Sequence, residues 1–393
     1  MPKLADVAEI NPRFDRSESN DLSEAISFVP MANVSEILGT ITSEENRDLG
    51  DVIKGFTTFK DRDVLVAKIT PCFENGKIAH ARIAKRLGFG STEFHVVRPV
   101  AEMLDDRYLY HFLRQPLVRE SGKLRMTGSG GQKRVPKAFL EELNIPLPPL
   151  PEQRRIAAIL DKADALRAKR REAIAKLDQL LQSMFLEMFG DPVTNPKGWP
   201  MKFFGEVCES SFRNGLSPST SGSVPGKVLT LSAITRQHFQ SHHQKEALFD
   251  RPPSDNQQVK MDTFLICRGN GNRQLVGVGV FPNHDLYDVC FPDTMIGANI
   301  AKDRASPRFI EQIWGSRLVR NQIESGASTT NGTFKINQRT LEKILIPIPP
   351  RELQAQFEII STKLMTMRVR MSIHSRLIDE NFRSLQHRMF GAL

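Results

Sequence analysis

The most regular hydrophobic pattern in the chain lies between Pro146 and Pro192. Apolar residues recur seven apart, with Arg170 interrupting the row, and a second row follows three residues later. The first row contains Ile156, Ala163, Leu177 and Met184, and the second contains Ile159, Leu166, Ala173 and Leu180. Such a heptad predicts a helix that packs along a partner helix rather than into a globular core. Prolines suit its first turn and Gly190 its end, which gives a rod of roughly 37 residues and about 55 Å.

The same pattern returns 201 residues later in the chain. The segment 145–149 (IPLPP) corresponds to 346–350 (IPIPP), and Met188-Phe189-Gly190 corresponds to Met389-Phe390-Gly391. The equivalent heptad positions of the second helix are Phe357, Leu364, Ile378 and Leu385. Because the heptad row is kept while the surface residues change, we expect two helices with one structural role that pack on each other as an antiparallel coiled coil.

The segments that precede the two helices repeat in the same register. Residues 4–9 (LADVAE) match 204–209 (FGEVCE), and 60–68 (KDRDVLVAK) match 260–268 (KMDTFLICR), so the offset stays at 200 or 201. A period this long excludes a solenoid and indicates two homologous domains, each followed by a long helix. The predicted organisation is a first domain over 1–145, a central long helix over 146–195, a second domain over 196–345 and a C-terminal long helix over 346–393.

Each repeat contains both strand-like and helical patterns. Short apolar runs at 64–66 and 94–97 indicate strands, and longer periodic stretches at 106–122 and 307–326 indicate helices. Turn-rich loops follow these helices, TGSGGQK at 127–133 and STTNGTFK at 328–335. The expected fold class is α+β, with two repeated α/β domains separated by two long antiparallel coiled-coil helices and a pseudo-two-fold internal repeat.

Composition narrows the class of partner. A net charge of +9 over 393 residues favours an anionic partner, with nucleic acid first, although a basic protein without such a partner has the same composition. The four cysteines show no paired spacing, which predicts neither a disulfide framework nor a zinc knuckle. No signal-peptide pattern and no apolar run of about 18 residues is found, so we expect a cytoplasmic protein.

Motifs that carry chemistry are missing from the sequence. No P-loop, no G-x-G-x-x-G, no Asn/Asp-Pro-Pro-Tyr/Phe box of amino-methyltransferases and no Glu-x-Lys or Asp-x-Lys of nucleases is present. His238, His242 and His243 with Glu246 form a possible metal cluster, but a solvated loop is favoured. The segment 268–272 (RGNGN) lacks the lysine and following helix of a phosphate-binding loop, so a β-turn is favoured. We therefore predict no catalytic residues and no metal site.

Two basic domains linked by rigid helices, without catalytic motifs, fit a protein that reads two short DNA segments separated by an unread gap. A pseudo-two-fold axis in the protein suits half-sites about one helical turn, roughly 34 Å, apart. A helix of the length estimated above is long enough to set that spacing.

The chain resembles the specificity subunits of type I restriction-modification systems. The residues that carry the resemblance are 145–157 (IPLPPLPEQRRIA), 346–358 (IPIPPRELQAQFE) and the central junction with MFGDP at 188–192 and NPKGWP at 195–200. The resemblance implies two target recognition domains, and helices that hold two methyltransferase subunits and allow restriction subunits to join. Such a complex methylates adenine N6 with S-adenosylmethionine, or cleaves unmethylated DNA with ATP and magnesium.

All these cofactors are implied to lie on partner subunits, so this chain is expected to be no enzyme on its own and to hold no cofactor. One departure from the repeat concerns the entry to the second helix, where Arg351-Glu352 replaces Leu150-Pro151. The two partner-binding helices are therefore not expected to be equivalent.

The candidate DNA-binding residues are polar or basic side chains in the Gly-rich loops and at register-matched basic positions. Specific readout needs paired donors or acceptors for base edges, while Lys and Arg neutralise phosphates. The candidates are Lys68, Lys77, Gln132, Lys133, Arg134, Arg268, Arg273, Asn331, Thr333 and Lys335. For each, an ordinary solvated surface residue is the alternative. Arg167, Lys169, Arg170 and Arg171 also attract phosphate, but ion pairs with nearby Asp164 and Glu172, or contacts with a partner, are favoured.

Three classes of function remain open from the sequence. The first is a non-catalytic DNA-recognition and assembly subunit that reads a bipartite target. The second is a nuclease or methyltransferase with a divergent active site, against which the missing motifs count. The third is a helical scaffold that binds only proteins, which predicts weak DNA binding without sequence preference.

Overall fold

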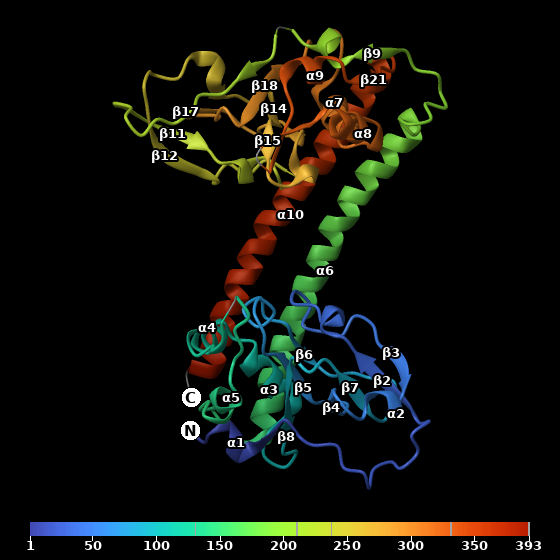
Figure 1. The fold of residues 1–393 in the computed structure, drawn as a ribbon, viewed down its shortest axis with the longest axis vertical. Coiled ribbons are helices and arrows are strands. Elements are labelled where there is room, and N and C mark those ends of the chain that lie inside the picture. The colour runs from blue at the N-terminus through green and yellow to red at the C-terminus, as the bar shows by residue number, and fades with distance from the viewer. Residues whose placement is uncertain (130, 210, 237, 331, 392–393) are drawn as a thin grey trace. The chain divides into compact units, whose positions relative to one another are not determined.

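The computed structural model describes residues 1–391 except 130, 210, 237 and 331 (Figure 1). Contacts divide the chain into two units, with residues 1–173 and 371–393 in unit 1 and residues 174–370 in unit 2. Each unit therefore contains one globular domain and one part of each long helix. The boundaries predicted at 145, 195 and 345 follow the helix ends rather than these contacts, and they stay a prediction.

Unit 1 begins with short elements that form two four-stranded sheets. Its helices are α1 (Leu4–Val7), α2 (Leu49–Val52), α3 (Asp106–Leu113), α4 (Pro116–Leu124) and α5 (Lys137–Glu141), with a 3-10 turn at Met31–Asn33. Its strands are β1 (Ala8–Ile10), β2 (Ala25–Val29), β3 (Glu45–Asp48), β4 (Thr57–Phe59), β5 (Val64–Ala67), β6 (Ile78–His80), β7 (Gly88–Gly90) and β8 (Phe94–Pro99). The sheet orders are β1-β8-β5-β6 and β3-β2-β7-β4.

Unit 2 repeats this order of elements. Its strands are β9 (Met201–Phe203), β10 (Arg213–Asn214), β11 (Val224–Leu229), β12 (Gln244–Phe249), β13 (Gln258–Val259), β14 (Thr263–Cys267), β15 (Gly269–Asn270), β16 (Gly279–Val280), β17 (Leu286–Cys290), β18 (Met295–Asn299), β19 (Ser328–Thr330), β20 (Thr333–Lys335) and β21 (Leu345–Pro347). Its helices are α7 (Pro307–Trp314), α8 (Arg317–Gly326) and α9 (Gln338–Glu342), with 3-10 turns at Phe204–Val207, Leu231–Ala233, Asp255–Gln257 and Arg273–Leu275.

The sheets confirm the duplication that the register predicted. The order β10-β18-β14-β16 in unit 2 matches β1-β8-β5-β6 in unit 1, and β12-β11-β17-β13 matches β3-β2-β7-β4. The central strands β5 and β14 are buried at every position, which explains their continuous apolar sequences. Two smaller sheets, β15-β20-β19 and β21-β9, complete unit 2.

The helix expected over 106–122 is in fact two helices, and so is the one expected over 307–326. Pro116 is the first residue of α4, and Gln115 before it is extended, because a proline disfavours helical geometry in the preceding residue. In unit 2 the break falls at Gly315-Ser316, and the Ser316 side chain accepts a hydrogen bond from the Val319 N–H at the start of α8. The periodicity alone did not reveal these breaks, because they depend on a proline and on a capping side chain.

The two predicted long helices are α6 (Leu150–Phe189) and α10 (Arg351–Gly391). In unit 1 the domain core includes Ile156 and Leu160 of α6 together with Phe382 and Phe390 of α10. In unit 2 the first part of α10, through Phe357, packs with the last part of α6. The helices therefore run antiparallel within each unit, and the α+β duplicated fold with two long helices is confirmed. None of the helices in the described part of the chain has the length and apolar character that a membrane span requires.

The first heptad row lies on the packed side of both helices. All eight of its apolar positions are buried or half-buried: Ile156, Ala163, Leu177, Met184, Phe357, Leu364, Ile378 and Leu385. In the second row Leu166 and Leu180 are corrected, because they are 62% and 46% exposed, while Ile159 and Ala173 are half-buried. The row that packs instead lies four residues after the first, at Leu160, Arg167, Ile174, Leu181 and Met188. A heptad alternates steps of three and four residues, so the pattern did not fix which step came first.

A buried glutamine attaches each long helix to its domain. The Gln153 side chain is fully buried, accepts a hydrogen bond from the Asp105 N–H (2.9 Å) and donates to the carbonyls of Met103 (2.9 Å) and Pro148 (2.8 Å). Gln354, its repeat equivalent, accepts from the Ser306 N–H (2.8 Å) and donates to the Pro349 carbonyl (2.7 Å). Asp105 and Ser306 are the N-caps of α3 and α7. One amide therefore ties the proline-rich helix entry to the start of a domain helix.

The helix pair carries an ion pair that is repeated with its partners exchanged. In unit 1 the Arg167 guanidinium donates to the Asp379 carboxylate (2.5 Å), and in unit 2 Arg368 donates to Asp178 (2.7 Å). Arg368 is the repeat equivalent of Arg167, and Asp379 is the equivalent of Asp178. The same two positions of the repeat therefore pair in both units, with the arginine on α6 in unit 1 and on α10 in unit 2.

We expect Leu160→Ala and Leu166→Ala to separate the packed and exposed sides of α6. Leu160 is fully buried in the unit 1 core, so its truncation should lower the free energy of unfolding by about 3 kcal/mol. Leu166 is mostly exposed, and the same change there should cost less than about 0.5 kcal/mol. Urea unfolding followed by circular dichroism measures both; equal losses would contradict the packing assigned here.

We expect Gln354→Leu to destabilise unit 2 by about 2 kcal/mol, because it leaves the Ser306 N–H and the Pro349 carbonyl buried without partners. The matched control is Gln356→Leu, two residues further along α10, where the side chain is exposed. Thermal unfolding of the full chain measures the difference. A Gln354→Leu variant as stable as the control would show that this amide does not hold the helix entry.

Candidate nucleic-acid interface

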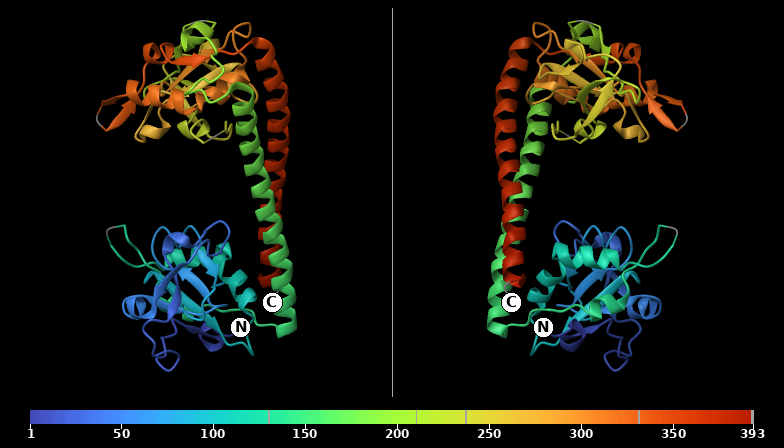
Figure 2. Two further views of the ribbon diagram at one scale, coloured as in Figure 1. Left: turned by 90° about the vertical axis from the view of Figure 1, so that its right-hand side faces the viewer. Right: turned by 90° about the vertical axis from the view of Figure 1, so that its left-hand side faces the viewer.

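In unit 1 the loop after α4 folds against the end of the central strand β5. Thr127 and Arg134 form an isolated antiparallel bridge, and Arg134 forms another with Ile69. The Thr70 N–H donates to the Lys133 carbonyl (2.9 Å), and the Val135 N–H donates to the Lys68 carbonyl (2.9 Å). The loop projects from its own domain (Figure 2). Two candidate groups that are distant in sequence, Lys68 and Gln132 to Arg134, therefore lie together.

Unit 2 builds the same arrangement from a β-hairpin. Strands β19 and β20 form the hairpin, and β20 also pairs with β15, where Gly269 lies opposite Lys335. The Ile336 N–H donates to the Arg268 carbonyl (2.9 Å), as Val135 does to Lys68 in unit 1. The β-turn expected over 268–272 is corrected, since Gly269 and Asn270 form a strand against the hairpin. This hairpin also projects from its domain in Figure 2.

The candidates differ in how free their side chains are. Gln132, Lys133 and Lys335 are exposed, and their side chains make no hydrogen bond or ion pair with the other residues that the structure describes. Lys68 and Thr333 are half-buried in the same two arrangements. Asn331 lies outside the described residues. Free lysines on a projecting hairpin have the chemistry for contacts with phosphate groups.

The remaining candidates hold their own loops in place. Lys77 Nζ donates to the Met31 carbonyl (3.1 Å), and Arg268 Nη1 donates to the Asp293 carbonyl (3.2 Å). Arg273 Nη2 donates to the Glu324 carbonyl (3.1 Å). Each of these three side chains already donates a hydrogen bond to a backbone carbonyl. Their contacts therefore support a role in positioning the loops.

Glu93, which the sequence did not single out, orients Arg134. The guanidinium donates to both carboxylate oxygens of Glu93 at 2.7 to 3.1 Å. This pairing lowers the pKa of Glu93 and raises the pKa of Arg134, and Lys68 lowers the Glu93 pKa further. Glu93 directly precedes the strand expected at 94–97, but its partner is 41 residues away in sequence. No local pattern therefore identified it.

His95 supports the base of the unit 1 loop from β8. Its Nε2 lies 2.8 Å from the Val135 carbonyl, and its Nδ1 lies 3.0 Å from the Asn11 side-chain nitrogen. The carbonyl requires Nε2 to carry the proton, so Nδ1 accepts from Asn11 in the neutral imidazole. Burial lowers the pKa of His95, with Lys68 and Lys137 adding to the effect against the opposing influence of the Val135 carbonyl and Glu141.

The structure offers no chemical centre in the residues that it describes. No group of three or more His, Cys, Asp or Glu among them lies close enough together to hold a metal ion. The cysteines are free, and burial raises the pKa of Cys208 to about 12 and of Cys267 and Cys290 to about 11. Thiols in that state are poor nucleophiles.

Comparison with known proteins finds a family whose model matches the first part of this duplicated α+β chain. Residues 1–176 match the family described as "Type I restriction modification DNA specificity domain". That part of the chain belongs to this family, and the resemblance to type I specificity subunits is confirmed.

The chain is 44% identical to the type I restriction enzyme EcoAI specificity subunit of Escherichia coli over 154 residues, which are 39% of this chain and 26% of the relative. It is 41% identical to the EcoEI specificity subunit of Escherichia coli over 160 residues, again 26% of the relative. The chain thus spans about a quarter of the length of these two relatives. A longer match reaches the EcoKI specificity subunit of Escherichia coli, 26% identical over 72% of this chain and 62% of that protein.

Solved structures share the fold over nearly the whole chain. The type I restriction-modification S subunit from M. genitalium has a TM-score of 0.56 at 14% identity, covering 99% of this chain and 95% of that chain. A chain from a structure described as the basis of complex assembly and conformational transition of the type I R-M system has a TM-score of 0.54 at 18% identity, covering 99% and 96%. At these identities the likeness concerns the fold alone.

We expect the unit 1 loop to be destabilised by acid through His95. Since the folded-state pKa of His95 lies below its ordinary value of 6.5, its contribution to stability is present above about pH 6.5 and is lost as the pH falls through the folded-state pKa. A His95→Gln variant, whose amide offers a donor and an acceptor but does not titrate, should lose less stability than the wild type between about pH 7 and about pH 5. Parallel melting curves for the two proteins over this range would contradict this role.

Proposed function

We propose that the chain is a non-catalytic DNA-recognition subunit of a type I restriction-modification complex. One observation carries the proposal. A projecting loop bonded to the end of the central strand recurs in both units, with Arg134 of unit 1 at the position of Lys335 in unit 2, and each loop carries an exposed lysine, Lys133 in unit 1 and Lys335 in unit 2. The first copy belongs to a family described as a DNA specificity domain, and the chain carries a net charge of +9, which supports a polyanionic partner.

The target is proposed to be bipartite, with each unit reading one half. The duplication supports this, because two copies of a reading element that differ in sequence at their loops suit two different short DNA segments. Free lysines supply affinity through phosphates, while Gln132 and Thr333 have donors and acceptors for base edges. The long helices, with 40 and 41 residues, are proposed to fix the length of the unread gap.

The helices are also proposed to hold two methyltransferase subunits and, through them, restriction subunits. Large apolar side chains remain exposed on α10, which is unusual for a helix that faces only water. They are Ile359, Met367, Val369, Ile373 and Leu377. S-adenosylmethionine, ATP and magnesium are proposed to bind to those partner subunits. The same exposed side chains fit the alternative of a scaffold that binds only proteins, so the decisive property is sequence-dependent DNA recognition.

The test of the proposed function is adenine methylation in a host without methylation systems of its own. The chain is co-expressed with the methyltransferase of its system, and the modified motif is read by long-read sequencing. Exchanging the domain of unit 1 or of unit 2 for that of a relative should change one half of a split motif and leave the other half unchanged. Methylation that ignores this chain would overturn the proposal and favour the protein-only scaffold.

We expect Lys133→Ala and Lys335→Ala each to weaken DNA binding of the co-expressed complex about equally for all sequences. Each change should reduce the slope of log affinity against log salt by about 0.9, the value for one lost phosphate contact. The charge-conserving controls Lys133→Arg and Lys335→Arg should keep the wild-type slope. Fluorescence anisotropy at several salt concentrations measures this, and an unchanged slope in both alanine variants would exclude phosphate contacts by these lysines.

A further inference from the structure

A cavity of about 270 Å³ in unit 1 is surrounded by arginines. It lies where α3 and α4 meet the parts of α6 and α10 that belong to this unit. Five arginines line it, together with only two acidic residues, Glu36 and Asp164. The arginines are Arg114, Arg119, Arg167, Arg171 and Arg383. The cavity therefore carries a clear excess of positive charge.

Two of these arginines are already fixed by protein contacts. Arg167 pairs with Asp379 and Asp164 (both 2.5 Å) and lies over the Phe382 ring, with its guanidinium carbon 4.3 Å from the ring centre. Arg114 donates to the Tyr110 hydroxyl (2.5 Å) and to backbone carbonyls of the 36–38 segment (3.4 Å each). These side chains form rigid walls of the cavity.

The other three arginines lack an acidic partner among the described residues. The Nε atoms of Arg119 and Arg171 are buried and have no hydrogen-bond acceptor there, and Arg383 is exposed. Burial, and then neighbouring arginines, lower the pKa of both Arg119 and Arg171. The side chains of Arg119 and Arg171 are half-buried, and an anion stabilises partly desolvated guanidinium groups that repel one another.

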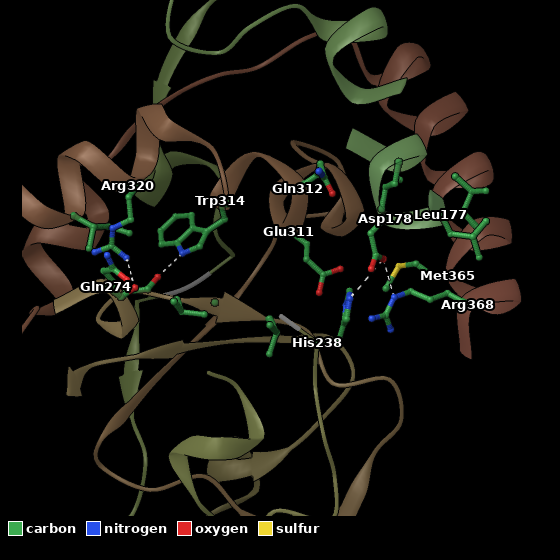
Figure 3. A pocket seen from close by; sticks show the side chains of 18 residues that line it. Leu177, Asp178, His238, Gln274, Glu311, Gln312, Trp314, Arg320, Met365 and Arg368 are labelled. Carbon is green, nitrogen blue, oxygen red and sulfur yellow. Dashed lines mark hydrogen bonds and ion pairs between the residues drawn. The ribbon is translucent and has the colours of Figure 1, made fainter. Parts of the chain in front are cut away.

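The second repeat shows that the shared fold does not require this charge. The equivalent cavity in unit 2, of about 360 Å³, is lined mainly by apolar side chains, with Leu177 and Met365 on the long helices and Trp314 on α7 (Figure 3). The Arg368–Asp178 pair is kept there, as the equivalent of Arg167–Asp379. Arg119 is also kept, as Arg320, which lines the unit 2 cavity. The repeat equivalents of the other three positions are Gly315 for Arg114, Ser372 for Arg171 and Gln182 for Arg383. Three arginines are therefore additions of the first repeat.

We propose that the unit 1 cavity binds a small phosphate-bearing ligand, either inorganic phosphate or the terminal phosphate of a nucleotide. Several guanidinium forks around one small cavity match the geometry and the double charge of a phosphate better than the single charge of a carboxylate. The cavity is large enough to admit such a group and is walled by four helices and two loops, which suits a ligand that enters it rather than a DNA backbone that lies across a surface. This site is independent of the proposed DNA recognition.

The test uses the full chain and inorganic phosphate, with isothermal titration calorimetry at constant ionic strength set by chloride. Arg171→Ser and Arg383→Gln install the residues of the second repeat. Together they should weaken phosphate binding about tenfold or more, because each removes a charged donor. The matched controls Arg170→Ser and Arg376→Gln change arginines on the same helices that do not line the cavity, and they should bind as the wild type does.

Folding of the variants is checked by their melting temperature in chloride, which should stay close to that of the wild type because a buried repulsion is removed. A nucleoside triphosphate is titrated in parallel, and binding at least as tight as that of phosphate would identify a nucleotide as the source. Absence of phosphate and nucleotide binding by the wild type would overturn the proposal. So would phosphate binding that persists in the double variant, or a duplex DNA that competes with phosphate and is lost with the same two changes.

Discussion

The attachment of each long helix to its domain depends on one buried side-chain amide. Gln153 and Gln354 each use their oxygen to accept the N–H of a helix N-cap residue and their nitrogen to satisfy the carbonyl of the proline-rich entry. Prolines suit this entry because they fix the backbone and donate no hydrogen bond. The carbonyls of Pro148 and Pro349 still need donors, and the glutamine side chains supply them. The glutamine is therefore the residue that makes a proline-rich helix start compatible with a packed domain.

Both repeats keep the ion pair between the long helices, while other residues differ between the repeats. The pairs Arg167–Asp379 and Arg368–Asp178 occupy equivalent positions of the two repeats, with the arginine and the aspartate on exchanged helices. An ion pair that is only partly buried adds little net stability. Its value lies in register, because sliding one helix along the other by a turn within a unit would separate the arginine from the aspartate.

Much of this architecture follows from the sequence because the repeat reports on long-range structure. A constant offset over many segments identified the domains, the long helices and the strand-end regions near Lys68 and Arg268 without any knowledge of contacts. Features that depend on the position of a single residue were harder to predict from the sequence. The helix break at Pro116 depends on one residue, and so does the packing of Leu160 rather than Ile159. Periodicity averaged over many residues does not resolve such differences.

The pairing of Glu93 with Arg134 and the arginine cavity were missed for another reason. Their members come from segments that are far apart in the chain, so no window of sequence contains them. A comparison of the two repeats does contain a signal. Where Arg171 and Arg383 of one copy align with Ser372 and Gln182 of the other, the fold is satisfied by neutral residues, and the charge needs an explanation of its own. In a duplicated protein each copy thus serves as the control for the other, and differences at equivalent positions mark where binding properties diverge from structural requirements.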